Sequence, residues 1–339
     1  MDSWLIWQLT GGTRHVTDIS NASRTLMLNI HTGQWDDELL GLFDVPRSVL
    51  PEVLPSVAEF GVVQPGLLGP GQCELPIAGV AGDQQSALLG QACLQPGDVK
   101  NTYGTGCFML MHTGHEAPVS QNGLITTCAA KTQADSLPDY ALEGSVFIGG
   151  AVVQWLRDGL RAIRHSNEVE ALAASVSDTD GVVLVPAFAG LGAPHWLPHV
   201  RGSIQGLTRG STVAHIARAA LESIALQSTE LLLAMQRDAQ NLQGLKVQAL
   251  RVDGGACANN LLMQMQADLL GLPVLRPQTV ETTALGAALL AGLGVGVFKS
   301  PDELRTRLGI ERVFEPQCSR DQAQAKLDAW QQAVRCLQP

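Results

Sequence analysis

The chain has 339 residues, of which 45% are hydrophobic and 16% are charged. This length and composition predict a globular protein of about two domains with sizeable cores. The formal net charge of -10 disfavours nucleic acid or an anionic membrane surface as a partner. Seven cysteines without a Cys-x-x-Cys pair disfavour a zinc ribbon or a disulfide framework, and they indicate free thiols in a reducing cytoplasm.

The sequence predicts neither a secretory signal nor membrane insertion. No basic stretch followed by an apolar one begins the chain. The most apolar stretch, Ala284 to Phe298, is shorter than the roughly 20 residues that span a bilayer. Because glycines interrupt it, we expect a buried helix that ends in a glycine-rich turn.

The first predicted element is a dense apolar helix. Asp2 and Ser3 resemble a helix N-cap, and an apolar run containing Trp4 and Trp7 follows. Natural termini are usually frayed and polar. We therefore expect the two tryptophans to be core residues whose partners precede Met1. The alternative, that they pack against the rest of this chain, stays open.

Predicted elements then follow in order up to a polar link, Gln95 to Asp98, where we place a domain boundary between residues 1–94 and 95–339. They are a strand-rich stretch over 16–30, a helix over 35–42, loops over 46–55 and 65–71, a buried strand over 75–80 and a helix over 84–94.

Beyond the link, strands alternate with helices, which predicts α/β layers. The predicted elements are a hairpin of strands near 99–102 and 107–112, a helix over 150–164, a strand over 182–185, a loop over 189–198, a helix over 214–235, a strand over 249–252, and helices from 259, over 283–293 and over 321–337.

A carboxylate and an amide lie together where a predicted strand ends. Asp83 and Gln84 follow Gly82 at this point. A kinase that acts on an alcohol needs a carboxylate beside the attacking hydroxyl to take its proton. An adjacent amide can orient the substrate. The alternative is that Asp83 only caps the following helix.

Three glycine-rich turns could approach a nucleotide closely. Residues 104–106 place Thr105 between two glycines, which suits a phosphate. Residues 253–255 follow a predicted strand, and the paired glycines suit a flat ring. Gly149 and Gly150 precede Gln154 at the head of a helix. Ordinary hairpin, strand-to-helix and helix-packing turns use the same residues, so these alternatives stay open.

Two other features are interpreted as structural. His195 and His199 lack a third ligand nearby, which disfavours a metal site. An apolar stripe with helical spacing is interpreted as core rather than as a binding face. The stripe consists of Ala217, Leu221, Ile224 and Leu231.

The order of these motifs resembles that of the FGGY carbohydrate kinases. Residues 202–207, 215–216 and 219–222 fit the long rear signature of that family position by position. Residues 21–25, 101–110 and 190–194 narrow the resemblance to its glycerol kinases. The resemblance extends from Asp2 to about Phe314.

The resemblance implies an α/β, actin-like ATPase fold with ribonuclease-H-like domains. It implies the remnant of an N-terminal domain followed by a complete C-terminal domain. It also implies in-line, Mg²⁺-assisted transfer of the γ-phosphoryl group of ATP to glycerol, in the cytoplasm, and association into homo-oligomers. By resemblance, Asp83 is the general base and Gln84 contacts glycerol. The nucleotide positions implied are Thr105 and Gly150 at the phosphates, with Gln154, Gly255 and Asn259 along the adenine nucleotide.

The chain departs from the family pattern in three places. The phosphate loop with its metal-holding aspartate, and an Arg-Glu pair, a tryptophan and a tyrosine that grip glycerol, would all precede Met1. Ligands for the metal therefore stay unassigned, and we expect this chain alone to have little kinase activity. Glu74 replaces an arginine of the fructose 1,6-bisphosphate site and would repel that ligand. The segment after Phe314 departs from the pattern that binds a sugar-transport regulator.

Two other functions stay open. The chain could derive from an FGGY kinase of a pentose, gluconate or another polyol, because most substrate contacts would lie outside it. It could also be a non-catalytic module that binds a nucleotide or a partner.

Overall fold

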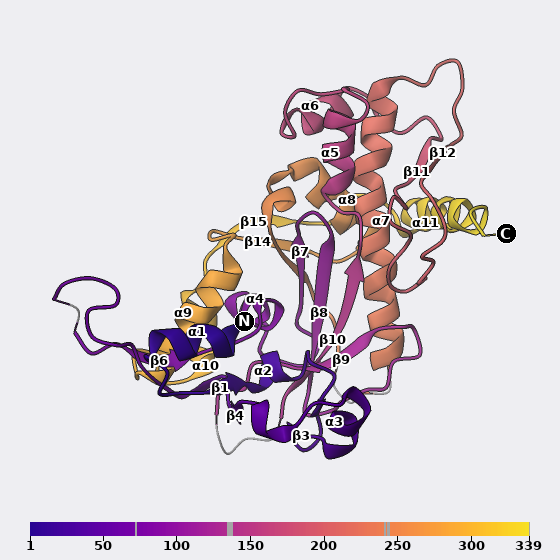
Figure 1. Ribbon diagram of the computed structural model, residues 1–339. Coiled ribbons are helices and arrows are strands. Elements are labelled where there is room, and N and C mark those ends of the chain that lie inside the picture. Colours follow the sequence, from indigo (N-terminus) through magenta and orange to yellow (C-terminus); the bar gives the residue numbers. More distant parts are fainter. Residues whose placement is uncertain (72, 134–137, 241, 243–244, 339) are drawn as a thin grey trace.

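The computed structural model describes residues 1–71, 73–133, 138–240, 242 and 245–338. Its centre is a seven-stranded sheet in the order β15-β14-β13-β7-β8-β10-β9 (Figure 1). Strands β14, β13 and β7 run parallel, and the other neighbours are antiparallel. The strands are β7 (Val99–Tyr103), β8 (Cys107–Gly114), β9 (Ile125–Cys128), β10 (Tyr140–Val146), β13 (Leu250–Asp253), β14 (Val274–Pro277) and β15 (Ile310–Phe314).

Helices cover both faces of this sheet, as expected for α/β layers. The 27-residue helix α7 runs along one face, and α4 lies on the other with α9 against it (Figure 1). The two-stranded pair β11 and β12 borders α7. The bounds are α4 (Asp83–Gly90), α5 (Ala151–Asp158), α6 (Glu168–Ala174), β11 (Val183–Val185), β12 (Ser203–Gln205), α7 (Val213–Ala239), η2 (Gly255–Ala258), α8 (Asn260–Leu270), α9 (Thr282–Gly294), α10 (Pro301–Arg307) and α11 (Arg320–Arg335).

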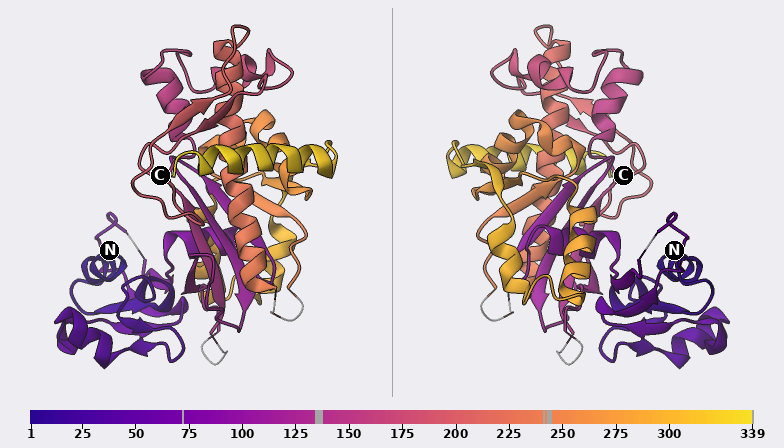
Figure 2. Two further views of the ribbon diagram at one scale, coloured as in Figure 1. Left: turned by 90° about the vertical axis from the view of Figure 1, so that its right-hand side faces the viewer. Right: turned by 90° about the vertical axis from the view of Figure 1, so that its left-hand side faces the viewer.

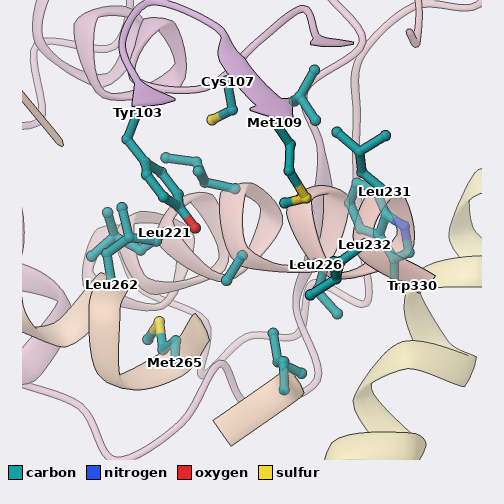
Figure 3. Packing of buried hydrophobic residues seen from close by; sticks show 14 of the residues in the cluster. Tyr103, Cys107, Met109, Leu221, Leu226, Leu231, Leu232, Leu262, Met265 and Trp330 are labelled. Atoms are coloured by element: carbon teal, nitrogen blue, oxygen red, sulfur yellow. The ribbon is translucent and has the colours of Figure 1, made fainter. Parts of the chain in front are cut away.

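The main core lies between the sheet and α7. Alternate residues of β7 and β8, such as Tyr103 and Met109, point from the sheet toward α7, α8 and α11 (Figure 3). Because side chains alternate between the two faces of a strand, the intervening residues face α4 instead. The predicted apolar stripe on α7 is core, since each of its four members is at most 1% exposed.

Residues 1–79, which we call the first lobe, project beside the sheet (Figure 2). The lobe has three separate strand pairs and only small apolar clusters. Its elements are α1 (Asp2–Leu9), β1 (Val16–Asp18), α2 (Ile19–Ala22), β2 (Leu28–Asn29), β3 (Gln34–Trp35), α3 (Asp37–Phe43), η1 (Arg47–Val49), β4 (Glu52–Leu54), β5 (Val57–Val62) and β6 (Pro76–Gly79).

Helices α4 and α9 cross with their backbones almost in contact. A Cβ atom added at Gly286 would lie 1.9 Å from the carbonyl oxygen of Ser86. One added at Gly90 would lie 2.1 Å from the carbonyl oxygen of Thr282. Glycine is the residue that permits such an approach. The crossing therefore fixes the distance between the two helices.

Most predicted elements are present, but several local predictions were wrong. Residues 16–30 contain the short helix α2, because the Asp18 carboxylate caps it by accepting from the N–H groups of Ser20 and Asn21. The predicted loop over 46–55 contains η1 and β4. Helix α5 ends at Asp158 instead of continuing to 164. Among the described residues, β5, β9, β10, β14 and β15 were missed altogether.

Burial was also overestimated in places. Strand β6 is only partly buried: Pro76 is exposed, whereas Ala78 is buried and Gly79 lies against the backbone of α9. Helix α9 exposes much of one side and buries Leu289 and Leu290 on the other. Its predicted glycine-rich end is present, and no helix among the described residues is long and apolar enough to cross a membrane.

The first helix, α1, forms, but its cap and its packing differ from the simplest expectation. Met1 is the N-cap and contributes no side-chain hydrogen bond, whereas Asp2 lies in the first turn. Trp4 is 62% exposed and Trp7 is 42% exposed. The Trp7 ring lies edge-on to His15, with 6.0 Å between the ring centroids. The alternative that both tryptophans pack against the rest of this chain therefore holds in part for Trp7 and fails for Trp4.

Candidate active site

The turn between β7 and β8 is held by backbone hydrogen bonds. The N–H groups of Gly150 and Gly149 donate to the carbonyl oxygens of Gly104 and Thr105, each at 2.8 Å. The N–H of Ala151 also donates to Thr105, at 3.1 Å. These bonds fasten the turn to the start of α5.

The bonds leave the turn with donors for a ligand. Within the described chain, the N–H groups of Thr105 and Gly106 have no protein acceptor, and the Thr105 hydroxyl has none either. Successive free N–H groups beside a hydroxyl suit the oxygens of a phosphate. The turn is therefore the predicted hairpin turn, and its free donors suit an anion.

A cavity of about 530 Å³ opens beside this turn. Its walls come from the β7–β8 turn, α5, the segment before α6, α7, and the segment from η2 to α8. A volume of this size fits a small molecule or cofactor. All five predicted nucleotide positions line it: Thr105, Gly150, Gln154, Gly255 and Asn259.

The turn after β13 forms one end of this cavity. Gly254 has a φ of +82°, and a Cβ atom there would lie 2.6 Å from the carbonyl oxygen of Tyr103, so the position requires glycine. At Gly255 an added Cβ would meet nothing within 4 Å, so this backbone faces open space. Asn259 caps α8 by accepting from the N–H of Leu262 at 2.9 Å. A flat group could lie along this exposed backbone.

Some lining residues were missed or interpreted too narrowly. Leu221 and Ile224 of the α7 stripe belong to the core, but they also form a wall of the cavity, so the interpretation that excluded a binding face was incomplete. Glu170 on α6 is the one charged side chain in the described lining, and it accepts from the N–H of Leu261 at 3.2 Å. The wall is therefore largely uncharged, with its anion-binding groups at the turn.

Asp83 and Gln84 lie outside the cavity, at the start of α4. Gly82 is the N-cap, so Asp83 is the first residue of the helix and not its cap. Its exposed carboxylate accepts from the backbone N–H of Gln84 at 2.8 Å and from Gln84 Nε2 at 3.3 Å. The carboxylate thus faces solvent with its orientation fixed by its neighbour.

A residue that the motifs did not reveal joins Gln84 to the sheet. Lys100 on β7 is 0% exposed. Its Nζ donates to Gln84 Oε1 at 2.5 Å, to Thr102 Oγ1 at 2.9 Å and to the carbonyl oxygen of Phe108 at 3.3 Å. Thr102 lies three residues before Thr105, which is about 10 Å of strand at roughly 3.3 Å per residue. The Asp83–Gln84 pair therefore lies along the same hairpin as the phosphate-suited turn.

Burial changes the ionisation of groups around the hairpin. It lowers the pKa of Lys100 from its usual value, although the Asp253 and Glu143 carboxylates oppose that change. It raises the pKa of the Cys107 thiol to about 12 and that of Cys257 also to about 12. All seven cysteines are free thiols, as predicted.

His195 of the 189–198 loop has a structural partner. His195 Nε2 lies 2.8 Å from Glu230 Oε2, which also accepts from Trp330 Nε1 at 2.6 Å. Within the ranges that the structure describes, His, Cys, Asp and Glu side chains form no group of three or more that could hold a metal ion.

The fold and the motifs belong to a known class of enzymes. The model of the C-terminal domain of the FGGY family of carbohydrate kinases matches residues 99–295, and the model of its N-terminal domain matches residues 1–90. The chain belongs to the FGGY family of carbohydrate kinases. It has the mixed α/β, actin-like fold of that family, with portions of both domains.

Within this family the chain is similar to glycerol kinases. It is 65% identical over 334 residues to the glycerol kinase of Acidovorax ebreus (strain TPSY) and 64% identical over 334 residues to that of Delftia acidovorans (strain DSM 14801 / SPH-1). Each match covers 98% of this chain and 66% of the relative. The chain therefore spans slightly less than two thirds of the length of these relatives.

Solved structures agree with this placement. The crystal structure of Plasmodium falciparum glycerol kinase with ADP superimposes with a TM-score of 0.92 at 38% identity, covering 100% of this chain and 66% of that one. A ligand-bound xylulose kinase from Lactobacillus acidophilus gives a TM-score of 0.85 at 21% identity, covering 99% of this chain and 66% of its own, and supports the fold alone.

Proposed function

We propose that this chain provides the nucleotide pocket and the acceptor-side carboxylate of an ATP:glycerol 3-phosphotransferase. The observation that carries the proposal is the cavity in which Thr105, Gly150, Gln154, Gly255 and Asn259 meet. The similarity to glycerol kinases supports glycerol as the acceptor. The domain boundary at residues 95–98 also stays a prediction.

In the proposed reaction, Asp83 accepts the proton of a terminal glycerol hydroxyl. The hydroxyl oxygen forms a bond to the γ-phosphorus of ATP, and the bond from that phosphorus to the β–γ bridging oxygen breaks. Glycerol 3-phosphate and ADP are the products. Gln84 orients the Asp83 carboxylate and offers its amide to a neighbouring hydroxyl of the acceptor.

The turn at residues 104–106 would hold the phosphates. Its free N–H groups and the Thr105 hydroxyl donate to phosphate oxygens, while the ring lies along the backbone at Gly255. Mg²⁺ at kinase sites is usually held by one or two carboxylates together with the phosphates. We assign it no ligand in this chain and derive no step through it.

We infer that this 339-residue chain by itself transfers the phosphoryl group from ATP to glycerol only slowly. The chain spans 66% of the length of its glycerol kinase relative, and it contains no Asp-x-Gly-Thr-Thr segment. Phosphoryl transfer depends almost wholly on positioning and charge stabilisation, so the missing groups cannot be replaced by binding alone. A coupled assay with ATP, Mg²⁺ and glycerol tests this inference, and turnover like that of a full-length enzyme would contradict it.

Nucleotide binding is the direct test of the cavity. Isothermal calorimetry should detect ADP binding to the chain. Gly255→Val should weaken that binding at least tenfold, because the new side chain enters open space that the nucleotide would occupy. Gly41→Val is the matched control, since a Cβ there also meets nothing within 4 Å but lies on α3. Equal binding by both variants would reject this nucleotide site.

A chimera tests the acceptor. It would join this chain, in native order, to the part of the Acidovorax ebreus glycerol kinase that lies outside the match. We expect phosphorylation of glycerol in preference to xylulose or gluconate, and a preference for a sugar would reject glycerol. A cytoplasmic location and homo-oligomers also stay predictions, the second open to light scattering.

A further inference from the structure

We propose that Lys100 is a positioning residue for phosphoryl transfer, which sets the orientation of the Gln84 amide and, through it, that of the Asp83 carboxylate. The proposal rests on the proposed function above. Lys100 touches neither the cavity nor solvent, so it acts only through its neighbours.

The hydrogen bonds around Lys100 form one directed chain. An ammonium group only donates, so its contact with Gln84 identifies the atom at 2.5 Å as the amide oxygen. The amide nitrogen must then point the other way, and it donates to Asp83 Oδ2 at 3.3 Å. With an uncharged, non-donating side chain at residue 100, the long contact between Gln84 Nε2 and Asp83 Oδ2 would be the remaining hydrogen bond that orients the Gln84 amide.

The burial of Lys100 is difficult to explain by stability alone. All three of its acceptors are uncharged, being an amide oxygen, a hydroxyl and a peptide carbonyl. The Asp253 and Glu143 carboxylates act on Lys100 without accepting a hydrogen bond from it. Burying a charge without a directly bonded counter-ion is unfavourable, and an apolar residue of similar volume often serves a core as well or better. A lysine in this position therefore indicates a functional role in the site.

The other two hydrogen bonds of Lys100 connect it to the turn that would hold the phosphates. Lys100 Nζ holds the hydroxyl of Thr102 and the carbonyl oxygen of Phe108, which lie on the two strands below the turn at residues 104–106. One buried ammonium thus connects the acceptor-side helix with both strands of the hairpin. A shift of Gln84 relative to the hairpin would break one of these bonds.

Spectroscopy of the chain itself tests the link without any turnover. In ¹⁵N-labelled protein, Lys100→Met should move the side-chain amide resonances of Gln84, whereas Lys246→Met should leave them in place, because Lys246 is exposed. Resonances that stay unchanged in Lys100→Met overturn the proposal. Melting temperatures of both variants should stay close to that of the parent, because the substitution is nearly equal in volume.

A second variant keeps the proposal testable if Lys100→Met folds poorly. Gln84→Glu retains an acceptor for Lys100 and adds a counter-ion, but it removes the donor that faces Asp83. We expect a melting temperature at or above that of the parent and a large loss of turnover in the chimera. Full turnover by Gln84→Glu would overturn the proposal.

Kinetics in the chimera separate this inference from the proposed function. Lys100→Met should lower kcat for glycerol on the order of 100-fold, the effect of misplacing a group by about 1 Å, with the KM for ATP nearly unchanged. Lys246→Met should stay within about twofold, as expected for a surface change. A parent chimera that fails to phosphorylate glycerol rejects the proposed function, and the resonances of Gln84 then still decide the role of Lys100.

Discussion

The first lobe (residues 1–79) and the remainder of the described chain, which we call the sheet region, differ in how their apolar side chains pack. The sheet region has one large core between the sheet and α7, together with smaller clusters around α4 and α9. The first lobe has small clusters around Ile6 and Ile19, and it leaves large apolar side chains such as Trp4 accessible. Groups that must keep a fixed geometry are therefore expected to depend on the sheet region.

Asp83 lies where the two regions meet, and the contacts that hold it come mainly from the sheet region. Its helix packs on α9 and on the sheet, and Gln84 is held by Lys100 of β7. From the first lobe, Ser20 Oγ accepts from the N–H of Gly82 at 2.9 Å. The carboxylate thus depends on the sheet region for its place, although the resemblance assigns it to the N-terminal domain.

The largest expected effect comes from the carboxylate itself. Asp83→Asn in the chimera should lower kcat by about 10² to 10⁴-fold, because the amide cannot accept the glycerol proton. ADP affinity should be unchanged, since Asp83 lies outside the cavity. Steady-state kinetics and calorimetry measure the two quantities. A small loss of kcat would mean that another group takes the proton.

The difference in packing can be tested with one leucine from each region. Leu142→Ala on β10, where the side chain is 0% exposed, should lower the free energy of unfolding by about 2–5 kcal/mol. Leu5→Ala on α1, where the side chain is 52% exposed, should change it by less than about 0.5 kcal/mol. Urea denaturation measures both. Similar losses would show that the first lobe has a core like that of the sheet.

The buried ammonium should make stability depend on pH. Burial lowers the pKa of Lys100 below its ordinary 10.5, against the opposing Asp253, Glu143, Cys93 and Asp83. Between the folded and unfolded pKa values the unfolded chain binds more protons, so stability rises with pH.

Relative to that of Lys100→Met, the free energy of unfolding of the parent should rise by at most about 1.4 kcal/mol per pH unit in that interval. Urea denaturation of both proteins from neutral pH up to about 10.4, the usual pKa of an unfolded lysine, tests this. A difference in unfolding free energy that stays constant with pH would show that Lys100 keeps an ordinary pKa.

The smallest effect concerns thiol reactivity. Cys73 and Cys336 are exposed and should react first with a disulfide reagent. Burial raises the pKa of Cys128 to about 12, which keeps it as the unreactive thiol. We expect two fast-reacting thiols in native protein and seven in denaturant. Fast reaction of more than three would show that a buried element opens readily, because Cys318 is partly accessible and the other four thiols are buried.

The sequence predicted the turns that follow β7 and β13, because glycine after a strand-like run marks the end of a strand. It could not predict Lys100, since a lysine after Val99 in an alternating strand is typical of a solvent-facing position. Its burial arises only when α4 covers that face. The sequence also could not predict that Leu221 and Ile224 form a wall of the cavity, because a helical stripe does not show which of its members border a cavity.

The crossing of α4 and α9 has a consequence for engineering this site. At Gly90 and Gly286 the two helices meet through main-chain atoms, so a side chain added at either position would push the helices apart. Libraries that vary the side chains around Asp83 can change the shape and the charge of the space beside its carboxylate. They cannot bring the Asp83 helix closer to α9, because the main chains of the two helices are already almost in contact. Selection for new acceptors will therefore act on what surrounds the carboxylate, while the carboxylate itself stays in place.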